Sequence, residues 1–324
     1  MTNDPTDSPA APTSTGSAGW RRSEVVIDLL RLHRELTALP TLSPNMHTNA
    51  LFNELVTVAT HPADCEIAQQ VLADPAIRRI IPGLRSLCSA GELELERAWA
   101  RRIITSHDPQ RELREFPYFT NYEQLTRLEH HAVLGVTGRA LPRMLFVGAG
   151  PLPLTSVLLA TQHGHTEIDN IDIDSEATRL AERLTGALQI DSLRFRRADV
   201  LACTDVADYD MVYVAAMVGP HPDDKSRVIK HLSQQMRPGA LLLARSAHSL
   251  RTLLYPPLTL RDLAGFRPLV VLNPHTEVVN SLVIAQKPPE PRPASQHSDA
   301  EEPETPHRTG SCPPPPSDCY PLGG

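Results

Sequence analysis

The chain is poor in aromatic residues, since phenylalanine, tryptophan and tyrosine make up 4% of its 324 residues. It also lacks an apolar run of the ~20 residues that a membrane-spanning helix requires. Its N-terminus lacks the basic start and apolar core of a secretory signal peptide. We therefore expect a cytoplasmic protein without a membrane partner.

Basic residues are fewer than acidic ones, 31 against 38, so the formal net charge is -7 at pH 7. Binding to phosphate backbones needs a basic face, so the charge argues against nucleic acid as a partner. The five cysteines are not spaced as metal ligands. The adjacent His130 and His131 point in different directions if they lie on a helix, which makes them a poor ligand pair. The sequence predicts no protein-bound metal.

The composition divides the chain into four segments. Residues 1–22 are mostly small or polar, and residues 288–324 carry proline runs. Both are predicted to be disordered tails, because they have too few apolar residues to form a core. Residues 23–135 lack strand patterns and are rich in helix formers, which predicts an all-helical N-terminal cover domain. Residues 136–287 alternate strand and helix patterns, as doubly wound α/β proteins do.

A glycine-rich turn follows the first predicted strand. The apolar run 144–147 breaks at Gly148 and Gly150, and a helical pattern resumes after Pro153. Glycine allows a sharp turn and a close approach to a ligand, and the exposed backbone donors of a helix start attract polar and anionic groups. The third glycine of the dinucleotide fingerprint is missing, which weakens the case for NAD. A tight turn without a ligand is the alternative.

Acidic residues follow the next two predicted strands. Asp172 comes about 20 positions after the glycine turn, where an acidic side chain can accept hydrogen bonds from ribose hydroxyls. Asp199 follows the third strand and is predicted to lie beside an adenine, while Asp174 is a further candidate for the ribose site. Ligands of open α/β sheets bind outside the carboxyl ends of the strands. The placement of these residues therefore indicates a cofactor site.

The last two predicted strands, 267–272 and 279–286, are close in sequence, which suggests an antiparallel final pair. Methyltransferase-type sheets end in this way, so S-adenosylmethionine (SAM) is favoured over NAD. The predicted fold is α/β, with a Rossmann-like class I SAM-dependent transferase sheet preceded by an all-helical domain. The predicted cofactor-binding residues are Gly148, Ala149, Gly150, Pro151, Thr155, Asp172 and Asp199.

The helical half carries two features that stand out. Glu92 and Glu96 are spaced i and i+4, which puts both carboxylates on one face of a helix, usually a solvated one. The segment 116–122 concentrates phenylalanine and tyrosine in a chain that has few of them. This concentration suggests a packed hinge or a pocket wall, with simple core packing as the alternative.

Several longer motifs resemble the nicotianamine synthase family. They occur in the family's order and at similar spacing, and they cover nearly all of residues 23–287. They include FPYFTNYEQLTRLE, GAGPLPLTSVLLA, NIDID, RPGALLLARSAHSLRTLLYP and NPHTEVVNSLVIAQK. The resemblance implies an enzyme that transfers the 3-amino-3-carboxypropyl group of SAM to an amine and releases methylthioadenosine. The product is a metal-chelating metallophore, so metal would be bound by the product.

The resemblance also implies catalytic residues. A glutamate of the helix and a tyrosine of the following segment line the reaction chamber in that family. Glu92 or Glu96 is therefore expected to act as the base that receives the amine proton, with Tyr118 and Tyr122 as partners. Ala90 stands where plant members have a further acid, so the choice between the two glutamates stays open.

Arg245 and His248 follow a predicted strand end and are expected to bind a substrate carboxylate. The alternative for Arg245 is an ion pair with an acidic residue within the fold.

Two other functions remain open: an ordinary SAM-dependent methyltransferase and a noncatalytic SAM-binding module. The acceptor amine also stays open between another SAM-derived unit and an amino acid such as histidine. Both are small molecules.

Overall fold

The computed structural model describes residues 21–61, 65–165, 167–219 and 222–289. These residues belong to one compact unit, Met1–Pro289. The predicted tails, 1–22 and 288–324, lie almost entirely outside the described residues. The division of the remainder into two domains near residue 135 stays a prediction. Within the described part of the chain, no helix is both long enough and apolar enough to cross a membrane.

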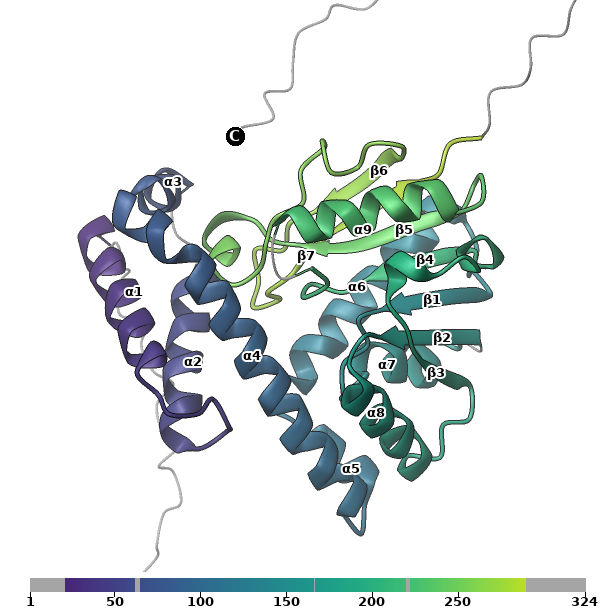
Figure 1. The fold of residues 1–324 in the computed structure, drawn as a ribbon, viewed down its shortest axis with the longest axis horizontal. Helices are drawn as coiled ribbons and strands as arrows, with labels where there is room; N and C mark the ends of the chain where they lie inside the picture. Colours follow the sequence, from purple (N-terminus) through teal and green to yellow (C-terminus); the bar gives the residue numbers. More distant parts are fainter. Residues whose placement is uncertain (1–20, 62–64, 166, 220–221, 290–324) are drawn as a thin grey trace, which may run out of the picture. The chain divides into compact units, whose positions relative to one another are not determined.

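The first part of the chain is helical, as predicted. Before the first strand, the described residues form α1 (Arg22–Thr37), α2 (Met46–Thr60), α3 (Cys65–Ala73), α4 (Pro75–Thr105), α5 (Pro109–Arg114) and α6 (Phe119–Thr137). The start of α4 is fixed by Asp74, whose carboxylate accepts a hydrogen bond from the Ala76 amide, and by Pro75 at the first helical position. Its 31 residues make α4 about 46 Å long. Figure 1 shows α4 between helices α1 to α3 and the sheet.

The second part is a seven-stranded mixed sheet in the order β3-β2-β1-β4-β5-β7-β6. Its strands are β1 (Arg143–Val147), β2 (Glu167–Asp172), β3 (Leu193–Arg197), β4 (Met211–Val214), β5 (Leu241–Ser246), β6 (Arg267–Leu272) and β7 (Ser281–Gln286). Strands β1 to β5 pair in parallel, whereas β7 is antiparallel to both β5 and β6. The predicted fold class and the antiparallel final pair are confirmed.

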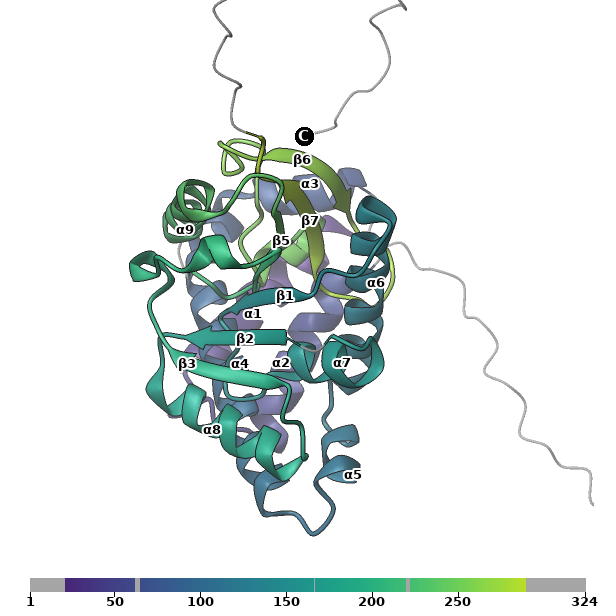
Figure 2. The same cartoon turned by 90° about the vertical axis from the view of Figure 1, so that its right-hand side faces the viewer.

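Helices α7 (Leu154–Gln162), α8 (Ser175–Ala187) and α9 (Pro222–Gln235) connect the strands. Side chains alternate along each strand, so Met144 and Phe146 join one apolar cluster while Leu145 and Val147 join another. The first cluster includes side chains of α4, α6 and α7, and the second includes α9. Figure 2 shows α6 and α7 on one side of the sheet and α9 on the other.

A third apolar cluster packs α1 to α4 together. It also contains Leu250 and Leu253 of the 3₁₀ turn Ser249–Leu253, and Val279 just before β7. Two segments from the carboxyl edge of the sheet are thus built into the helical core. This packing brings side chains of residues 250–279 beside α4.

Candidate active site

A large cavity opens at the carboxyl ends of the parallel strands. We call it the strand-end cavity; its volume is about 570 Å³, within the usual range for small-molecule sites. Its walls include residues 146–150 at the end of β1, 171–174 at the end of β2, 198–201 after β3 and 215–219 after β4. Six of the seven predicted cofactor-binding residues line it: Gly148, Ala149, Gly150, Thr155, Asp172 and Asp199. The seventh, Pro151, is buried and lines neither this cavity nor the second one described below.

The turn after β1 needs glycine at two positions. Gly148 and Gly150 have φ values of +80° and +68°, in the left-handed region that side chains rarely adopt. A Cβ at Gly150 would lie 2.6 Å from Glu96 Oε2, and one at Gly148 would lie 2.4 Å from Val218 Cγ2. The turn is therefore closely packed against both α4 and the segment after β4.

Asp172 braces this turn. Its Oδ2 accepts a hydrogen bond from the Gly150 amide and its Oδ1 accepts one from the Asp174 amide, both at 2.9 Å. Burial raises the pKa of the Asp172 carboxyl, and these backbone donors oppose the rise. A carboxylate has about four lone-pair positions, so these backbone donors do not use all of them and a ribose hydroxyl can still donate to Asp172.

The other two aspartates have local partners as well. Asp174 caps α8, accepting hydrogen bonds from the Glu176 and Ala177 amides, and also pairs with Arg97 at 2.7 Å. Asp199 is exposed at the cavity wall, and its Oδ1 accepts a hydrogen bond from the Leu201 amide. Asp174 is thus largely used in joining α8 to α4.

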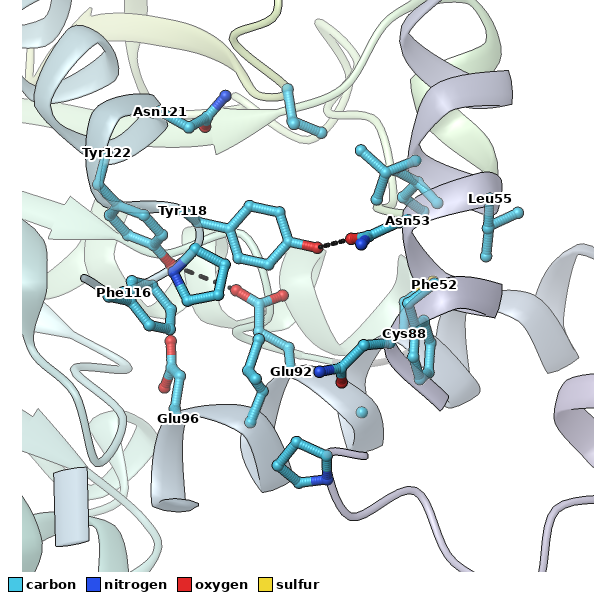
Figure 3. A pocket seen from close by; sticks show the side chains of 18 of the residues that line it. Phe52, Asn53, Leu55, Cys88, Glu92, Glu96, Phe116, Tyr118, Asn121 and Tyr122 are labelled. Atoms are coloured by element: carbon cyan, nitrogen blue, oxygen red, sulfur yellow. Dashed lines mark hydrogen bonds between the residues drawn. The ribbon is translucent and has the colours of Figure 1, made fainter. Parts of the chain in front are cut away.

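A second, smaller cavity lies among the helices, and we call it the helical chamber. Its volume is about 130 Å³, and it is formed by α2, α4 and α6 with residues 116–118, 254–255 and 279–280 (Figure 3). Gly91 lets α2 approach α4, because a Cβ there would lie 2.3 Å from Phe52 Cζ. Most of the chamber wall is apolar, with the hydroxyls of three tyrosines and several amides among the polar groups.

Glu92 and Glu96 of α4 line both cavities, as do Tyr122 and Asn280. These four residues form the junction between the cavities. Figure 3 shows the Glu92 carboxylate inside the chamber, below Tyr118 and Tyr122. The i, i+4 spacing thus places both carboxylates on cavity walls.

Two tyrosine hydroxyls hold the Glu92 carboxylate. Tyr122 donates to Oε1 at 3.3 Å and Tyr255 donates to Oε2 at 3.1 Å. Burial raises the pKa of Glu92, and the two hydrogen bonds oppose that rise because they stabilise the ionised form. Burial and the nearby charges, first of Glu92 and then of Asp172, hold the pKa of Glu96 well above its ordinary value.

The aromatic segment forms both a pocket wall and part of the core. Phe116 is buried, with edge-to-face contacts to Tyr118 at 5.9 Å and Trp99 at 5.7 Å between ring centroids. Tyr118 reaches across the chamber and donates to Asn53 Oδ1 at 3.4 Å (Figure 3). Burial and the charges of Glu92 and Glu96 raise the pKa of Tyr122 well above its ordinary value, so its hydroxyl stays protonated.

Arg245 is 4% exposed and lines the strand-end cavity. Its Nε and Nη2 donate to the two carboxylate oxygens of Glu129 at 2.9 and 3.2 Å, and Nη2 also donates to Thr155 Oγ1. The structure thus contains the ion pair that the sequence left as the alternative. A role in binding substrate stays a prediction.

His248 has no place on either cavity wall. Its Nδ1 lies 2.7 Å from Ser281 Oγ, in a hydrogen bond between the segment after β5 and the start of β7. Its ring contacts that of His275, and burial lowers its pKa to about 4. The structure does not bring it together with the other predicted site residues.

Tyr255 and Glu129 of this region were not predicted from the sequence. Asn280 belongs to the motif NPHTEVVNSLVIAQK, for which the sequence left a site role and hairpin packing both open. Tyr255 meets Glu92 across 163 positions of the chain, and no local pattern indicates such a contact. Glu129 is 1% exposed, although charged residues on helices are usually exposed. Asn280 directly precedes the antiparallel β7, and the start of that strand lies at the carboxyl edge of the sheet.

In the part of the chain that the structure describes, no group of three or more histidine, cysteine, aspartate or glutamate side chains is placed to hold a metal ion.

Comparison with protein families gives one match over most of the chain. The family model described as nicotianamine synthase protein matches residues 20–292. A nicotianamine synthase of Solanum lycopersicum is 39% identical over 271 residues, covering 82% of this chain and 84% of the relative. Nicotianamine synthase 3 of Oryza sativa subsp. japonica is 40% identical over 271 residues, covering 81% of this chain and 78% of the relative.

Two crystal structures of a protein named MtNAS have a similar fold. A glutamate-to-glutamine variant in complex with SAM gives a TM-score of 0.71 at 26% identity and covers 82% of this chain and 98% of that one. MtNAS in complex with MTA and tNA gives a TM-score of 0.72 at 26% identity with the same coverage.

Proposed function

Because the chain belongs to the nicotianamine synthase family, we propose that it transfers the 3-amino-3-carboxypropyl group of SAM to an amine. The reaction releases methylthioadenosine and builds a chelator that binds metal through its own amines and carboxylates. One observation carries the proposal: the strand-end cavity and the helical chamber meet at two half-buried glutamates, Glu92 and Glu96. A ligand in the first cavity can therefore present its reacting end to an amine in the second.

We place the adenosyl part of SAM in the strand-end cavity. The Gly148–Gly150 turn lets the backbone approach the ligand, and Asp172 has lone pairs left for the ribose hydroxyls. We assign Asp199, exposed on the same wall, to the adenine. The MtNAS crystals hold SAM in one case and MTA in another, which supports this type of ligand in the fold.

The chemistry is a displacement at carbon. The acceptor nitrogen attacks the methionine-side γ-carbon in line with the sulfur, so a C–N bond forms while the C–S bond breaks. The sulfur takes the electron pair, loses its positive charge and leaves as the thioether of methylthioadenosine. The amine loses one proton to a carboxylate, which returns it to solvent. SAM has three carbons on its sulfonium, so the shape of the junction selects which one reacts.

We assign the base role to Glu92. Its carboxylate lies in the helical chamber, where the acceptor binds, and the hydroxyls of Tyr122 and Tyr255 favour its ionised form. A raised pKa brings a carboxyl closer to the pKa of an amine and makes it a better proton acceptor. Glu96 lies against Gly150 on the SAM side, where it can face the amino group or the sulfonium of the donor.

Product analysis tests the proposal. Purified protein is mixed with SAM alone, then with histidine or other amino acids, and the products are measured by mass spectrometry. Methylthioadenosine and an amine enlarged by one or more aminocarboxypropyl groups are expected. S-adenosylhomocysteine as the only product would instead indicate a methyltransferase, and bound SAM without turnover would favour a noncatalytic module.

The same assay separates the two glutamates. Glu92→Gln should lower methylthioadenosine release by about 10²- to 10⁴-fold, the usual contribution of a general base, and still bind SAM. Glu96→Gln should lower the rate of methylthioadenosine release less than Glu92→Gln does. Equal activity of the two variants would reject the assignment of the base.

A further inference from the structure

Asn280 lies where the two cavities meet. It directly precedes β7, whose first residue, Ser281, pairs with Ser246 at the end of β5. The antiparallel direction of β7 brings Asn280 to the carboxyl edge of the sheet, where the parallel strands end. It lines both the strand-end cavity and the helical chamber.

The amide group of Asn280 is not fully used within the described residues. The side chain is 7% exposed, and its Nδ2 is buried without a hydrogen-bond partner there. Nearly all buried donors in folded proteins have a partner, so an orphaned one calls for an explanation. A ligand that brings a hydrogen-bond acceptor to the cavity junction would give this donor its partner.

The charges around the junction indicate what that acceptor is. Glu92 and Glu96 form one side of it, and no lysine, arginine or histidine is among the described residues that line the helical chamber. Two arginines line the strand-end cavity, but Arg227 is exposed and pairs with Asp224. Arg245 already donates through Nε and Nη2 to Glu129 and Thr155. Two carboxylates attract an amino group and repel another carboxylate. A group that carries both therefore turns its amine towards the glutamates and its carboxylate towards a neutral donor.

We propose that the Asn280 side chain donates a hydrogen bond to the carboxylate of the 3-amino-3-carboxypropyl group of SAM. The identity of this ligand rests on the proposed function. Asn280 then orients the transferred group between a neutral donor and the acidic pair, and so helps to direct its γ-carbon into the helical chamber. The residue binds the donor and takes no part in proton transfer.

Binding of three unreactive or truncated ligands tests this contact. S-adenosylhomocysteine carries both the amine and the carboxylate, decarboxylated SAM carries only the amine, and methylthioadenosine carries neither. Dissociation constants are measured by calorimetry for the wild type and for Asn280→Leu, which has a similar volume and no donor. We expect the variant to bind S-adenosylhomocysteine about 10- to 100-fold more weakly, the usual effect of losing a hydrogen bond to a charged group. Its affinity for the other two ligands should stay within about 2-fold of that of the wild type.

Asn280→Asp provides a second variant of nearly the same shape. It places a negative charge beside the carboxylate, so it should bind S-adenosylhomocysteine even more weakly relative to decarboxylated SAM. Asn121→Leu is the matched control, because the Asn121 amide lines the chamber but already donates to the Glu277 carbonyl at 2.7 Å. This control should leave the ratio of the two affinities unchanged.

Equal weakening of all three ligands by the Asn280 variants would overturn the proposal and indicate a packing role. Unchanged binding of S-adenosylhomocysteine would overturn it as well. These measurements need no turnover, so they can succeed even if product analysis contradicts the transferase function. Conversely, the transferase function can hold while this contact fails.

Discussion

The pKa of the Glu92 carboxyl depends on its hydrogen-bond donors as well as on its burial, which is the larger effect. Tyr255 and Tyr122 each donate to one of its oxygens, and both bonds lower a pKa that burial raises. A general base must be ionised, so its activity falls when the pH drops through its pKa. The two tyrosines therefore extend the active pH range towards acid.

Replacing Tyr255 tests this argument. Tyr255→Phe removes one donor, so the pKa of Glu92 should rise and the acid limb of the kcat/KM profile should move to higher pH. Tyr118→Phe is the control, because the Tyr118 hydroxyl donates to Asn53 and not to the Glu92 carboxylate. Rates of methylthioadenosine release across the acid range give both profiles. An unmoved acid limb in Tyr255→Phe, or an equal shift in the control, would contradict the assigned role.

Sequence patterns identify site residues only when their partners are close in the chain. Glu92 and Glu96 share a helix face, and Gly148 and Gly150 share a turn, so spacing alone draws attention to them. Tyr255 and Asn280 reach the junction through tertiary packing, which leaves no local pattern. The family motif around Asn280 marks the segment but does not separate binding from packing.

At the scale of elements, the junction depends on how closely α4 approaches the turn after β1. Gly150 has φ +68°, and the Glu96 carboxylate occupies the space where a side chain would be. Gly150→Ala should therefore strain the backbone and displace Glu96, which would weaken SAM binding and slow methylthioadenosine release together. Calorimetry with SAM and the product assay measure the two effects.

Gly186→Ala is the matched control for that substitution. Gly186 lies in α8, and a Cβ there meets nothing within 4 Å. Alanine should stabilise the helix by about 0.5–1 kcal/mol without altering SAM binding. If Gly150→Ala bound SAM as well as this control does, the close packing of the turn would be irrelevant to the cofactor.

The order of the elements was largely predictable, because periodicity and turn residues are local. The alternation of strands and helices predicted the parallel sheet, and the short spacing of the last two strands predicted their antiparallel pairing. The helical chamber was not predictable in the same way. It exists because Leu250, Leu253 and Val279 pack into the core of α1 to α4. The sequence shows that these residues are apolar, but it does not show which apolar cluster each of them joins.

For the molecule as a whole, the ends of two neighbouring strands are joined by one buried lysine side chain. Lys225 of α9 is 2% exposed, and its Nζ donates to the carbonyls of Ala216 at 3.1 Å and Arg245 at 2.8 Å. Ala216 lies after β4 and lines the strand-end cavity, and Arg245 belongs to β5. Lys225 thus stabilises the edge of the sheet from behind the cavity wall.

Burial, followed by the charge of Arg245, lowers the pKa of Lys225 from 10.5 to about 7. Between these values the unfolded chain binds more protons at this residue than the folded chain does. Its contribution to the free energy of unfolding therefore rises with pH, by at most about 1.4 kcal/mol per pH unit, and is lost as the pH falls through about 7.

Lys225→Met removes this titration. Urea unfolding of both proteins from about pH 7 to about pH 9 should give a difference, wild type minus variant, that grows with pH. A difference that stays constant over this range would show that Lys225 keeps an ordinary pKa in the folded protein.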